Sequence, residues 1–331
     1  MNPRLSSLVA EAHVVSIPLR TKFRGLTERE LLVFEGPNGF SEWAAFPEYS
    51  DEEAAAWLSA ALEWGFGNLP IPKRSSVPVN AILPAVSTQD VAKILTRAGK
   101  FRTVKIKTAE KGQGVLDDLA RILEVQNLYP EAKIRLDANG GFEIAQVLDL
   151  LEKLSFEGIQ LEYFEQPVST IAELAELKVE IARTGQTTLI AADESVRKSS
   201  DPLAVELAGA ADVLVLKSAP LGGIASTLEI AASSKLPVVS SSAMQSSIGL
   251  SAELHFAACL DEMEFDAGLG TMNLFAGDLV KDSLKPVDGV LEVRRPEVST
   301  SALDTLKAED HRYDWWIARL ERCGRLIGLE S

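Results

Sequence analysis

The sequence predicts an α/β fold, a modified TIM barrel of the (β/α)7β type with an α+β N-terminal capping domain completed by the C-terminal segment. From about residue 77, eight short runs rich in Val, Ile and Leu alternate with helical patterns. The runs are rich in Val, Ile and Leu rather than evenly alternating with polar residues, which is typical of parallel strands covered on both faces. Eight such strands separated by helices favour a closed barrel over an open sheet.

The first 75 residues are predicted to form the capping domain. They contain strand-like runs, a Gly36-Pro37-Asn38-Gly39 turn and one helical pattern that follows a cluster of acidic residues. The expected strands lie at 11–19, 28–36 and 40–44, and the expected helix at 51–64.

The barrel is predicted over residues 76–284. Within 142–154, apolar residues recur at helical spacing, and Thr170 with Glu173 and Ser87 with Asp90 resemble capping boxes at helix starts. The expected strands lie at 77–82, 103–107, 133–137, 159–164, 188–193, 212–217, 237–241 and 263–267.

Residues 285–331 are expected to pack back on the capping domain. A hairpin is predicted at 285–295 and a helix at 310–326. The sequence leaves open whether the protein is a monomer or a homo-oligomer.

Composition narrows the class of protein. Among 331 residues, 33 Lys and Arg face 48 Asp and Glu, so the formal net charge is −15, and nucleic acid or anionic membrane is not expected as a main partner. Two cysteines exclude a disulfide scaffold and a Cys-rich zinc site. The absence of a long apolar run predicts no membrane span, and the N-terminus lacks a secretory pattern, so a cytoplasmic location is expected.

Charged residues stand at the ends of successive predicted barrel strands, one βα unit apart. A single Asp or Lys at such a position is usually a helix cap or a solvated charge. The carboxyl ends of parallel barrel strands meet on one face, however, so the whole set is expected to converge there. Its members are Lys105, Lys107, Asp137, Glu165, Asp193 and Lys217.

Three converging carboxylates repel one another, and a divalent cation removes that conflict. Oxygen ligands without Cys or His select a hard ion, so Mg²⁺ is predicted, with Mn²⁺ as a substitute. The metal and the ammonium of Lys105 both lower the pKa of Lys107 toward the range useful for a general base. Such a base beside a metal that binds a carboxylate predicts removal of the α-proton to give a metal-stabilised enediolate.

These residues resemble those of the enolase superfamily, muconate-lactonizing subgroup. The resemblance covers the whole chain, from the capping domain through the barrel to the C-terminal segment. The motifs that carry it are TVKIK (103–107), RLDANGGF (135–142), EYFEQP (162–167), AADES (191–195) and DVLVLK (212–217).

The resemblance implies roles for individual residues. Asp137, Glu165 and Asp193 would bind the metal, while Asn139 and Glu194 would orient the ligands and lysines. Lys107 would be the acid and base, Lys105 would tune or position it, and Lys217 would face it across the substrate.

Within the subgroup, the chain is most similar to actinobacterial enzymes that dehydrate 2-succinyl-6-hydroxy-2,4-cyclohexadiene-1-carboxylate to o-succinylbenzoate in menaquinone biosynthesis. The similar stretches are 18–30, 36–49 and 268–280. The implied enzyme is a carbon–oxygen lyase acting on a small dicarboxylate. In this syn-dehydration, Lys107 takes the α-proton and returns it to the departing hydroxyl, while Lys217 stays protonated.

Two other interpretations remain open. The same lysine pair suits two-base racemisation of an N-succinylamino acid, alone or beside the dehydration. Dipeptide epimerases of the subgroup carry Asp-x-Asp at the last strand. This chain has Glu264-Phe265-Asp266 there, which disfavours dipeptide epimerisation. A barrel without catalytic activity is disfavoured, because a bare scaffold has no need of converging charges.

Candidate substrate contacts lie in loops expected at the same rim. The basic segment 20–29 is interpreted either as a lid that attracts an anionic substrate or as a solvated loop. Small polar groups after the seventh strand suit a carboxylate, and a glycine after the last strand permits close approach. The candidates are Arg20, Arg24, Ser241, Ser242, Met244 and Gly268.

Overall fold

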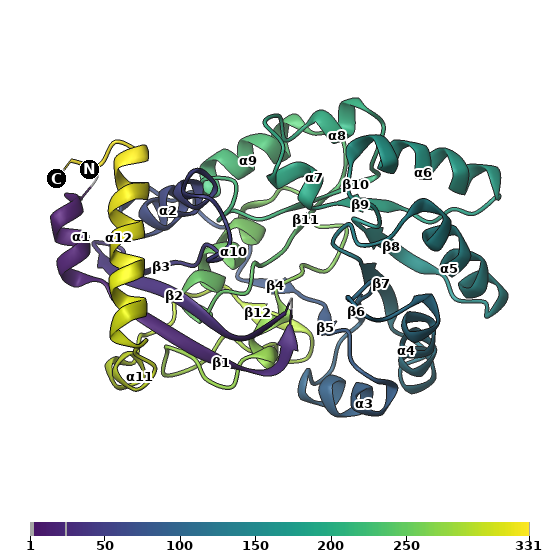
Figure 1. Ribbon diagram of the computed structural model, residues 1–331, viewed down its shortest axis with the longest axis horizontal. Coiled ribbons are helices and arrows are strands. Elements are labelled where there is room, and N and C mark those ends of the chain that lie inside the picture. The colour runs from purple at the N-terminus through teal and green to yellow at the C-terminus, as the bar shows by residue number, and fades with distance from the viewer. Residues whose placement is uncertain (1–2, 24, 331) are drawn as a thin grey trace.

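The computed structural model, which describes residues 3–23 and 25–330, places a three-stranded antiparallel sheet beside a parallel barrel (Figure 1). The antiparallel sheet has the order β1-β2-β3. Its strands are longer than the sequence predicted at the first hairpin, because β1 and β2 continue almost to the tip. They are β1 (His13–Phe23), β2 (Leu26–Gly36) and β3 (Gly39–Trp43).

Three helices pack around this sheet. Ser50 caps the N-terminus of α2, where its hydroxyl accepts the N–H of Glu53 at 3.2 Å. The predicted C-terminal helix forms over the expected residues and lies against α2, with the rings of Trp43 and Trp316 edge to face at 5.3 Å (Figure 1). The helices are α1 (Leu5–Glu11), α2 (Asp51–Phe66) and α12 (Asp310–Leu326).

Seven parallel strands form the wall of the barrel, in the order β11-β10-β9-β8-β7-β6-β5. The second and third predicted strands form over the expected residues, and each ends in a charged residue. The strands are β5 (Ala81–Leu83), β6 (Thr103–Lys107), β7 (Lys133–Asp137), β8 (Leu161–Glu165), β9 (Ile190–Ala192), β10 (Val213–Leu216) and β11 (Val238–Ser240).

The eighth position of the barrel is filled by a short segment rather than a full strand. Ala267 bridges Val79 and Gly268 bridges Ser241, both in parallel, so the predicted strand 263–267 pairs only at its end. This segment closes the wall between β11 and the start of β5.

The predicted first barrel strand is divided in two. Pro78 has no N–H to donate, so β4 (Ser76–Pro78) ends before β5 begins. The partner of β4 is β12 (Val290–Glu292), in antiparallel register. The predicted hairpin at 285–295 is therefore mainly a strand that pairs with residues before the barrel, beside a tight Val287–Val290 bridge.

Helices follow most strands and cover the outside of the barrel (Figure 1). Thr170 and Glu173 form the predicted capping box, while the Ser87 hydroxyl bonds the Asp90 carboxylate without capping a backbone N–H. These helices are α3 (Thr88–Arg97), α4 (Val115–Leu128), α5 (Ile144–Phe156), α6 (Ile171–Arg183), α7 (Glu194–Arg197), α8 (Ala204–Leu207), α9 (Ile224–Ser233) and α10 (Ser247–Cys259). The 3-10 helix η1 (Gly270–Leu274) follows the eighth segment, and α11 (Thr300–Thr305) lies beside α12.

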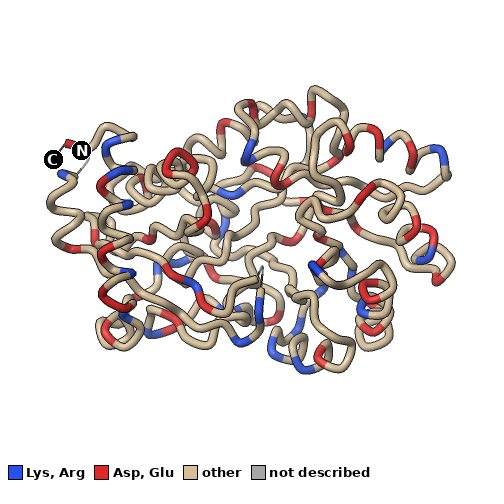
Figure 2. The backbone as a smooth tube through the Cα atoms, in the orientation of Figure 1, with Lys and Arg blue, Asp and Glu red and all other residues tan. Residues whose placement is uncertain are grey.

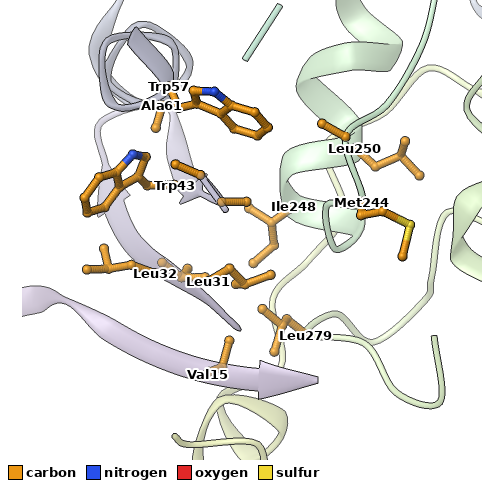
Figure 3. Packing of buried hydrophobic residues seen from close by; sticks show 14 of the residues in the cluster. Val15, Leu31, Leu32, Trp43, Trp57, Ala61, Met244, Ile248, Leu250 and Leu279 are labelled. Atoms are coloured by element: carbon orange, nitrogen blue, oxygen red, sulfur yellow. The ribbon is translucent and has the colours of Figure 1, made fainter. Parts of the chain in front are cut away.

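One hydrophobic core joins the antiparallel sheet to the barrel. Leu31 and Trp43 of the sheet and Ile248 and Leu250 of α10 are buried in a single cluster. Figure 3 shows these side chains between the sheet strands and α10, with Met244 beside them on the loop before that helix. The burial of this apolar surface fixes the sheet on one end of the barrel.

Glu42 adds a polar contact across the same boundary. Its buried carboxylate accepts the N–H groups of Ser246 at 3.2 Å and Gly249 at 3.1 Å, together with the Ser246 hydroxyl. These groups belong to the first turn of α10, where a negative charge suits the helix dipole. Burial nevertheless raises the pKa of Glu42 to about 7, against the lowering effect of these donors.

Lys and Arg residues and Asp and Glu residues are spread along the backbone in both parts of the molecule (Figure 2). In the part of the chain that the structure describes, no helix is long and apolar enough to cross a membrane.

The substitution Glu42→Gln should remove a pH-dependent part of the stability. Because the folded pKa of about 7 exceeds the ordinary 4.5, the unfolded chain releases this proton first, and the free energy of unfolding falls as pH rises from 4.5 to about 7. At ~1.4 kcal/mol per pKa unit, Glu42 accounts for a loss of roughly 3 kcal/mol. Urea unfolding at pH 5 and pH 8 measures it.

The exposed Glu52→Gln on α2 is the matched control and should keep the wild-type pH dependence. Equal pH dependence in wild type and Glu42→Gln would contradict the assignment.

Candidate active site

Strand register brings the predicted charges together at the carboxyl end of the barrel. Lys107 of β6 pairs with Asp137 of β7, and Asp137 pairs with Glu165 of β8. Asp193 follows β9, and Lys217 follows β10. The strands therefore order these side chains around one rim.

Each carboxylate of the row faces a lysine. Lys105 Nζ lies 2.8 Å from Glu165 Oε2 and 3.3 Å from Asp137 Oδ2. Lys107 Nζ lies 2.5 Å from Asp137 Oδ2, and Lys217 Nζ lies 2.5 Å from Asp193 Oδ2. The three acids are at most 1% exposed, so these contacts operate away from bulk water.

Asn139 and Glu194 form a chain of hydrogen bonds beside the row. Lys107 Nζ donates to Asn139 Oδ1 at 2.6 Å, and Asn139 Nδ2 donates to Glu194 Oε1 at 3.1 Å. Arg197 completes the chain, with contacts to Glu194 at 2.7 Å and Asp193 at 3.2 Å. The sequence reasoning missed Arg197, although its spacing of three and four residues from these acids on α7 is a recognisable signal.

Gln166 holds the loop that carries Asp193, and it was also missed. Its Oε1 accepts the N–H groups of Asp193 and Ser195, each at 3.1 Å, and its Nε2 donates to Ser195 Oγ at 2.7 Å. Gln166 is buried and has a positive φ of 38°, a backbone conformation held by these contacts. Gln166 follows Glu165 directly, so the same turn helps to fix the positions of Glu165 and Asp193.

The pKa values of the three acids are shifted in two different directions. Burial raises the pKa of Glu165 to about 7, and the charge of Asp137 adds to that effect. Burial acts in the same direction on Asp137 and Asp193, but the facing ammonium groups outweigh it and hold both pKa values well below the usual range.

The pKa values of the two lysines of β6 are also shifted in opposite directions. Burial opposes the charge on Lys105, yet Glu165 and Asp137 outweigh burial and raise its pKa. Burial lowers the pKa of Lys107, with the charge of Lys105 acting in the same direction against Asp137. Lys107 is therefore the lysine of this strand that is more easily deprotonated.

The donor set fits a divalent cation of the hard type. Glu165 Oε1 is buried and accepts no hydrogen bond within the described residues. As the side chains stand, no group of three His, Cys, Asp or Glu among the described residues converges on one point, because each carboxylate is turned toward a lysine. Three carboxylates with an unpaired oxygen among them match oxygen-ligand chemistry.

A cavity of about 40 Å³ lies over the lysines. Four of the predicted substrate contacts line it, namely Ser241, Ser242, Met244 and Gly268. Phe23 also lines it, with its ring centroid 5.5 Å from Lys107 Nζ, as do Ile82 and Thr271. These three carry no sequence signal of their own, because they reach the site through the hairpin tip, the end of β5 and η1.

The predicted basic lid is only partly described. Arg20 is exposed and lines a separate groove with Asp90, Lys93 and Arg97, rather than the cavity over Lys107. Arg24 lies outside the described residues. A role for either arginine in substrate binding stays a prediction.

Comparison with known proteins finds related family models for the N-terminal part and for the barrel part of the chain. A family model described as "Enolase N-terminal domain-like" matches residues 14–65, and one described as "Enolase C-terminal domain-like" matches residues 88–297. The o-succinylbenzoate synthase of Mycobacterium tuberculosis (strain ATCC 25618 / H37Rv) is 45% identical over 325 residues, which are 98% of this chain and 97% of that protein. The o-succinylbenzoate synthase of Mycolicibacterium smegmatis is 44% identical and is covered to 98%.

Solved structures show the same fold at lower identity. The muconate lactonizing enzyme from Pseudomonas fluorescens complexed with muconolactone aligns with a TM-score of 0.74 at 20% identity, over 90% of this chain and 98% of that one. A mandelate racemase/muconate lactonizing enzyme from Roseiflexus sp. aligns with a TM-score of 0.68 at 23% identity, over 87% and 94%.

Divalent cations should stabilise the protein through the acidic row. At a free Mg²⁺ concentration of 100 times the dissociation constant, the folded state gains about 2.7 kcal/mol, which appears as a higher melting temperature. Glu165→Gln should weaken the affinity at least tenfold, because it removes a charged ligand. Calorimetric titration with Mg²⁺ and with Mn²⁺ measures the affinity, and scanning calorimetry with each ion measures the melting temperature.

Glu152→Gln changes an exposed acid on the neighbouring helix α5 and should leave the affinity unchanged. If Glu165→Gln binds the ions as tightly as wild type, the acidic row is not the metal site.

Proposed function

Because the chain belongs to the enolase superfamily, we propose that it is an o-succinylbenzoate synthase, a Mg²⁺-dependent lyase that dehydrates 2-succinyl-6-hydroxy-2,4-cyclohexadiene-1-carboxylate. The relatives of that name match this chain over almost its whole length. The observation that carries the proposal is the buried row of carboxylates with Lys107 near one end and Lys217 at the other.

Enzymes of this superfamily generally use a divalent metal, and we assign Mg²⁺ with Asp137, Glu165 and Asp193 as its ligands. When bound, the ion would hold the substrate carboxylate and stabilise the negative charge that forms on it after α-proton removal. Each acid would exchange part of its lysine contact for a contact with the ion. The unpaired Glu165 Oε1 supports this assignment.

Lys107 acts first as the base and then as the acid. Burial lowers the pKa of Lys107, which favours the neutral amine, and Asp137 with Asn139 holds Nζ in place. Lys107 takes the α-proton, and the electron pair of the broken C–H bond moves onto the substrate carboxylate. That pair returns to form the ring double bond as the C–O bond to the hydroxyl breaks. Lys107 then donates its proton to that hydroxyl, so water leaves from the same face and the ring becomes aromatic.

Lys217 holds a positive charge on the other side of the substrate. Its ammonium contacts the carboxylate of Asp193 in a buried position, so the two charges balance each other away from water. From there it stabilises the anionic intermediate, and a cation over a ring contributes about 0.5–2 kcal/mol. In this reaction no proton has to pass through Lys217.

Substrate entry requires the cover of the site to move. A cavity of about 40 Å³ is far below the roughly 300 Å³ or more typical of ligand pockets. Phe23 stands at the hairpin tip directly over Lys107, so displacement of this tip is the shortest way to enlarge the space. Ser241 and Ser242 would then meet the second carboxylate of the substrate.

A second candidate activity is racemisation of an N-succinylamino acid. It is favoured by one observation: Lys107 and Lys217 enter the same cavity from strands on opposite sides of the acidic row. Two amines placed in this way can remove an α-proton from one face and return one to the other. The two activities differ in whether Lys217 must lose a proton.

Purified protein with Mg²⁺ should convert the cyclohexadiene carboxylate to product, followed by the ultraviolet change of ring aromatisation. Lys107→Ala should lower kcat at least a thousandfold, because one residue supplies both proton transfers. EDTA should abolish turnover and Mg²⁺ should restore it. Activity in Lys107→Ala close to that of wild type would overturn the assignment.

Lys217→Arg should separate the two candidate activities. It keeps a cation, so dehydration should fall by about tenfold or less, whereas racemisation should fall at least a hundredfold because Arg does not deprotonate. Parallel assays with the cyclohexadiene carboxylate and an N-succinylamino acid measure the two rates. Lys178→Arg, in a lysine–aspartate pair outside the site, is the control. An equal loss of both rates in Lys217→Arg would mean that Lys217 has the same role in each.

A further inference from the structure

Glu253 is a buried acid that the proposed reaction does not use. It lies on α10 with no exposed surface, and its carboxylate accepts the N–H groups of Ser218 at 2.7 Å and Ala219 at 3.0 Å. These are the two residues directly after Lys217. Glu253 therefore holds the backbone at the base of the lysine that faces the substrate.

Gln245 extends this contact to the loop that lines the cavity. Its Nε2 donates to Glu253 Oε1 at 3.2 Å, and its Oε1 accepts the N–H of Ala243 at 2.8 Å. Ala243 lies between the cavity-lining residues Ser242 and Met244. One carboxylate and one amide thus connect the Lys217 loop with the substrate loop.

Only a carboxylate satisfies all the donors at this position. It accepts three N–H groups, from two backbone amides and one side-chain amide. An apolar side chain would leave those donors without this acceptor, and an amide would turn its own NH₂ toward one of them. Burial disfavours the charge and raises the pKa of Glu253, so the acid is retained at an energetic cost.

Met244 shows that the substrate loop is held in a specific shape. It is buried with a positive φ of 61°, which is unfavourable for a side chain of this kind. Arg29 Nε donates to the Met244 carbonyl at 3.0 Å, which fixes the loop from the side of the antiparallel sheet. Gln245, the next residue, fixes it from the side of the barrel.

We infer that Glu253 and Gln245 form a positioning pair that sets Lys217 and the substrate loop relative to each other. The inference rests on the role proposed above for Lys217. Neither residue touches the reacting atoms, so the pair acts through the backbone of residues 218–219 and 243.

An exchange of the two side chains tests the pair. In Glu253→Gln alone, the amide NH₂ groups of residues 245 and 253 face each other. In Gln245→Glu alone, two carboxylates face each other. In the double variant, the carboxylate introduced at position 245 would accept from the N–H of Ala243 and from the amide at position 253. The oxygen of that amide would still accept from Ser218. Each single variant should lower kcat at least tenfold, and the double variant should recover at least threefold over the better single variant.

The rates are measured on the substrate that the wild type turns over, since both candidate activities use Lys217. Mg²⁺ affinity should stay within threefold of wild type in all three variants. Ser251→Ala, a buried change on the same helix whose hydroxyl bonds only the Ile248 carbonyl among the described residues, should leave kcat unchanged. A double variant no better than either single variant, or single variants within twofold of wild type, would overturn the pair.

A second readout does not need turnover. Amide hydrogen exchange of Ser218 and Ala219 should become at least tenfold faster in Glu253→Gln. In the exchanged variant, exchange of Ser218 should slow again because its N–H regains an acceptor, whereas Ala219, which faces the amide NH₂ at position 253, should stay fast. Failure of the proposed function would appear as a wild type without activity, whereas failure of the pair would appear as unchanged exchange at these amides. If Glu253→Gln does not fold, Gln245→Ala decides: it removes only the bridge, and wild-type kcat and KM would contradict the inference.

Discussion

The structure depends on the burial of three carboxylates at one rim of a barrel. Away from water, such charges are tolerated only when positive charge is close by. Three lysines and Arg197 supply it here. The lysines meet the acids through strand register, whereas Arg197 lies four residues after Asp193 on α7. The same requirement explains why the site fits a divalent ion and why Lys107 differs from Lys105 in its ease of deprotonation.

The antiparallel sheet shapes the space above the acidic rim of the barrel. The hydrophobic core of the sheet continues into α10. Arg29 donates a hydrogen bond to the loop before α10, and Glu42 accepts a hydrogen bond at the first turn of this helix. Phe23 at the hairpin tip of the sheet covers Lys107. The barrel therefore provides the charged row, whereas the sheet shapes the space in which a substrate meets it, and α10 is the element that contacts both.

The sequence was informative where function and local structure coincide. The strands that end in Lys107 and Asp137 could be located to the residue, because each is a short run with Val, Ile or Leu that ends in a charged residue. Contacts between distant segments left no such mark. Phe23 falls in the segment 20–29, interpreted from the sequence as a lid or a solvated loop, and Glu253 looks like a polar residue of an apolar helix. The eighth barrel strand is reduced to isolated bridges beside short partner strands. The division of the chain at residues 75 and 285 remains a prediction.

The central claim is that one divalent ion lies among the three acids, between two lysines. A crystal structure of the protein grown with Mn²⁺, with anomalous scattering to locate the metal, tests it most directly. The account predicts a single ion within about 2.5 Å of an oxygen from each of Asp137, Glu165 and Asp193, with Lys107 and Lys217 on either side. An ion bound elsewhere, with these acids still paired to the lysines, would contradict it.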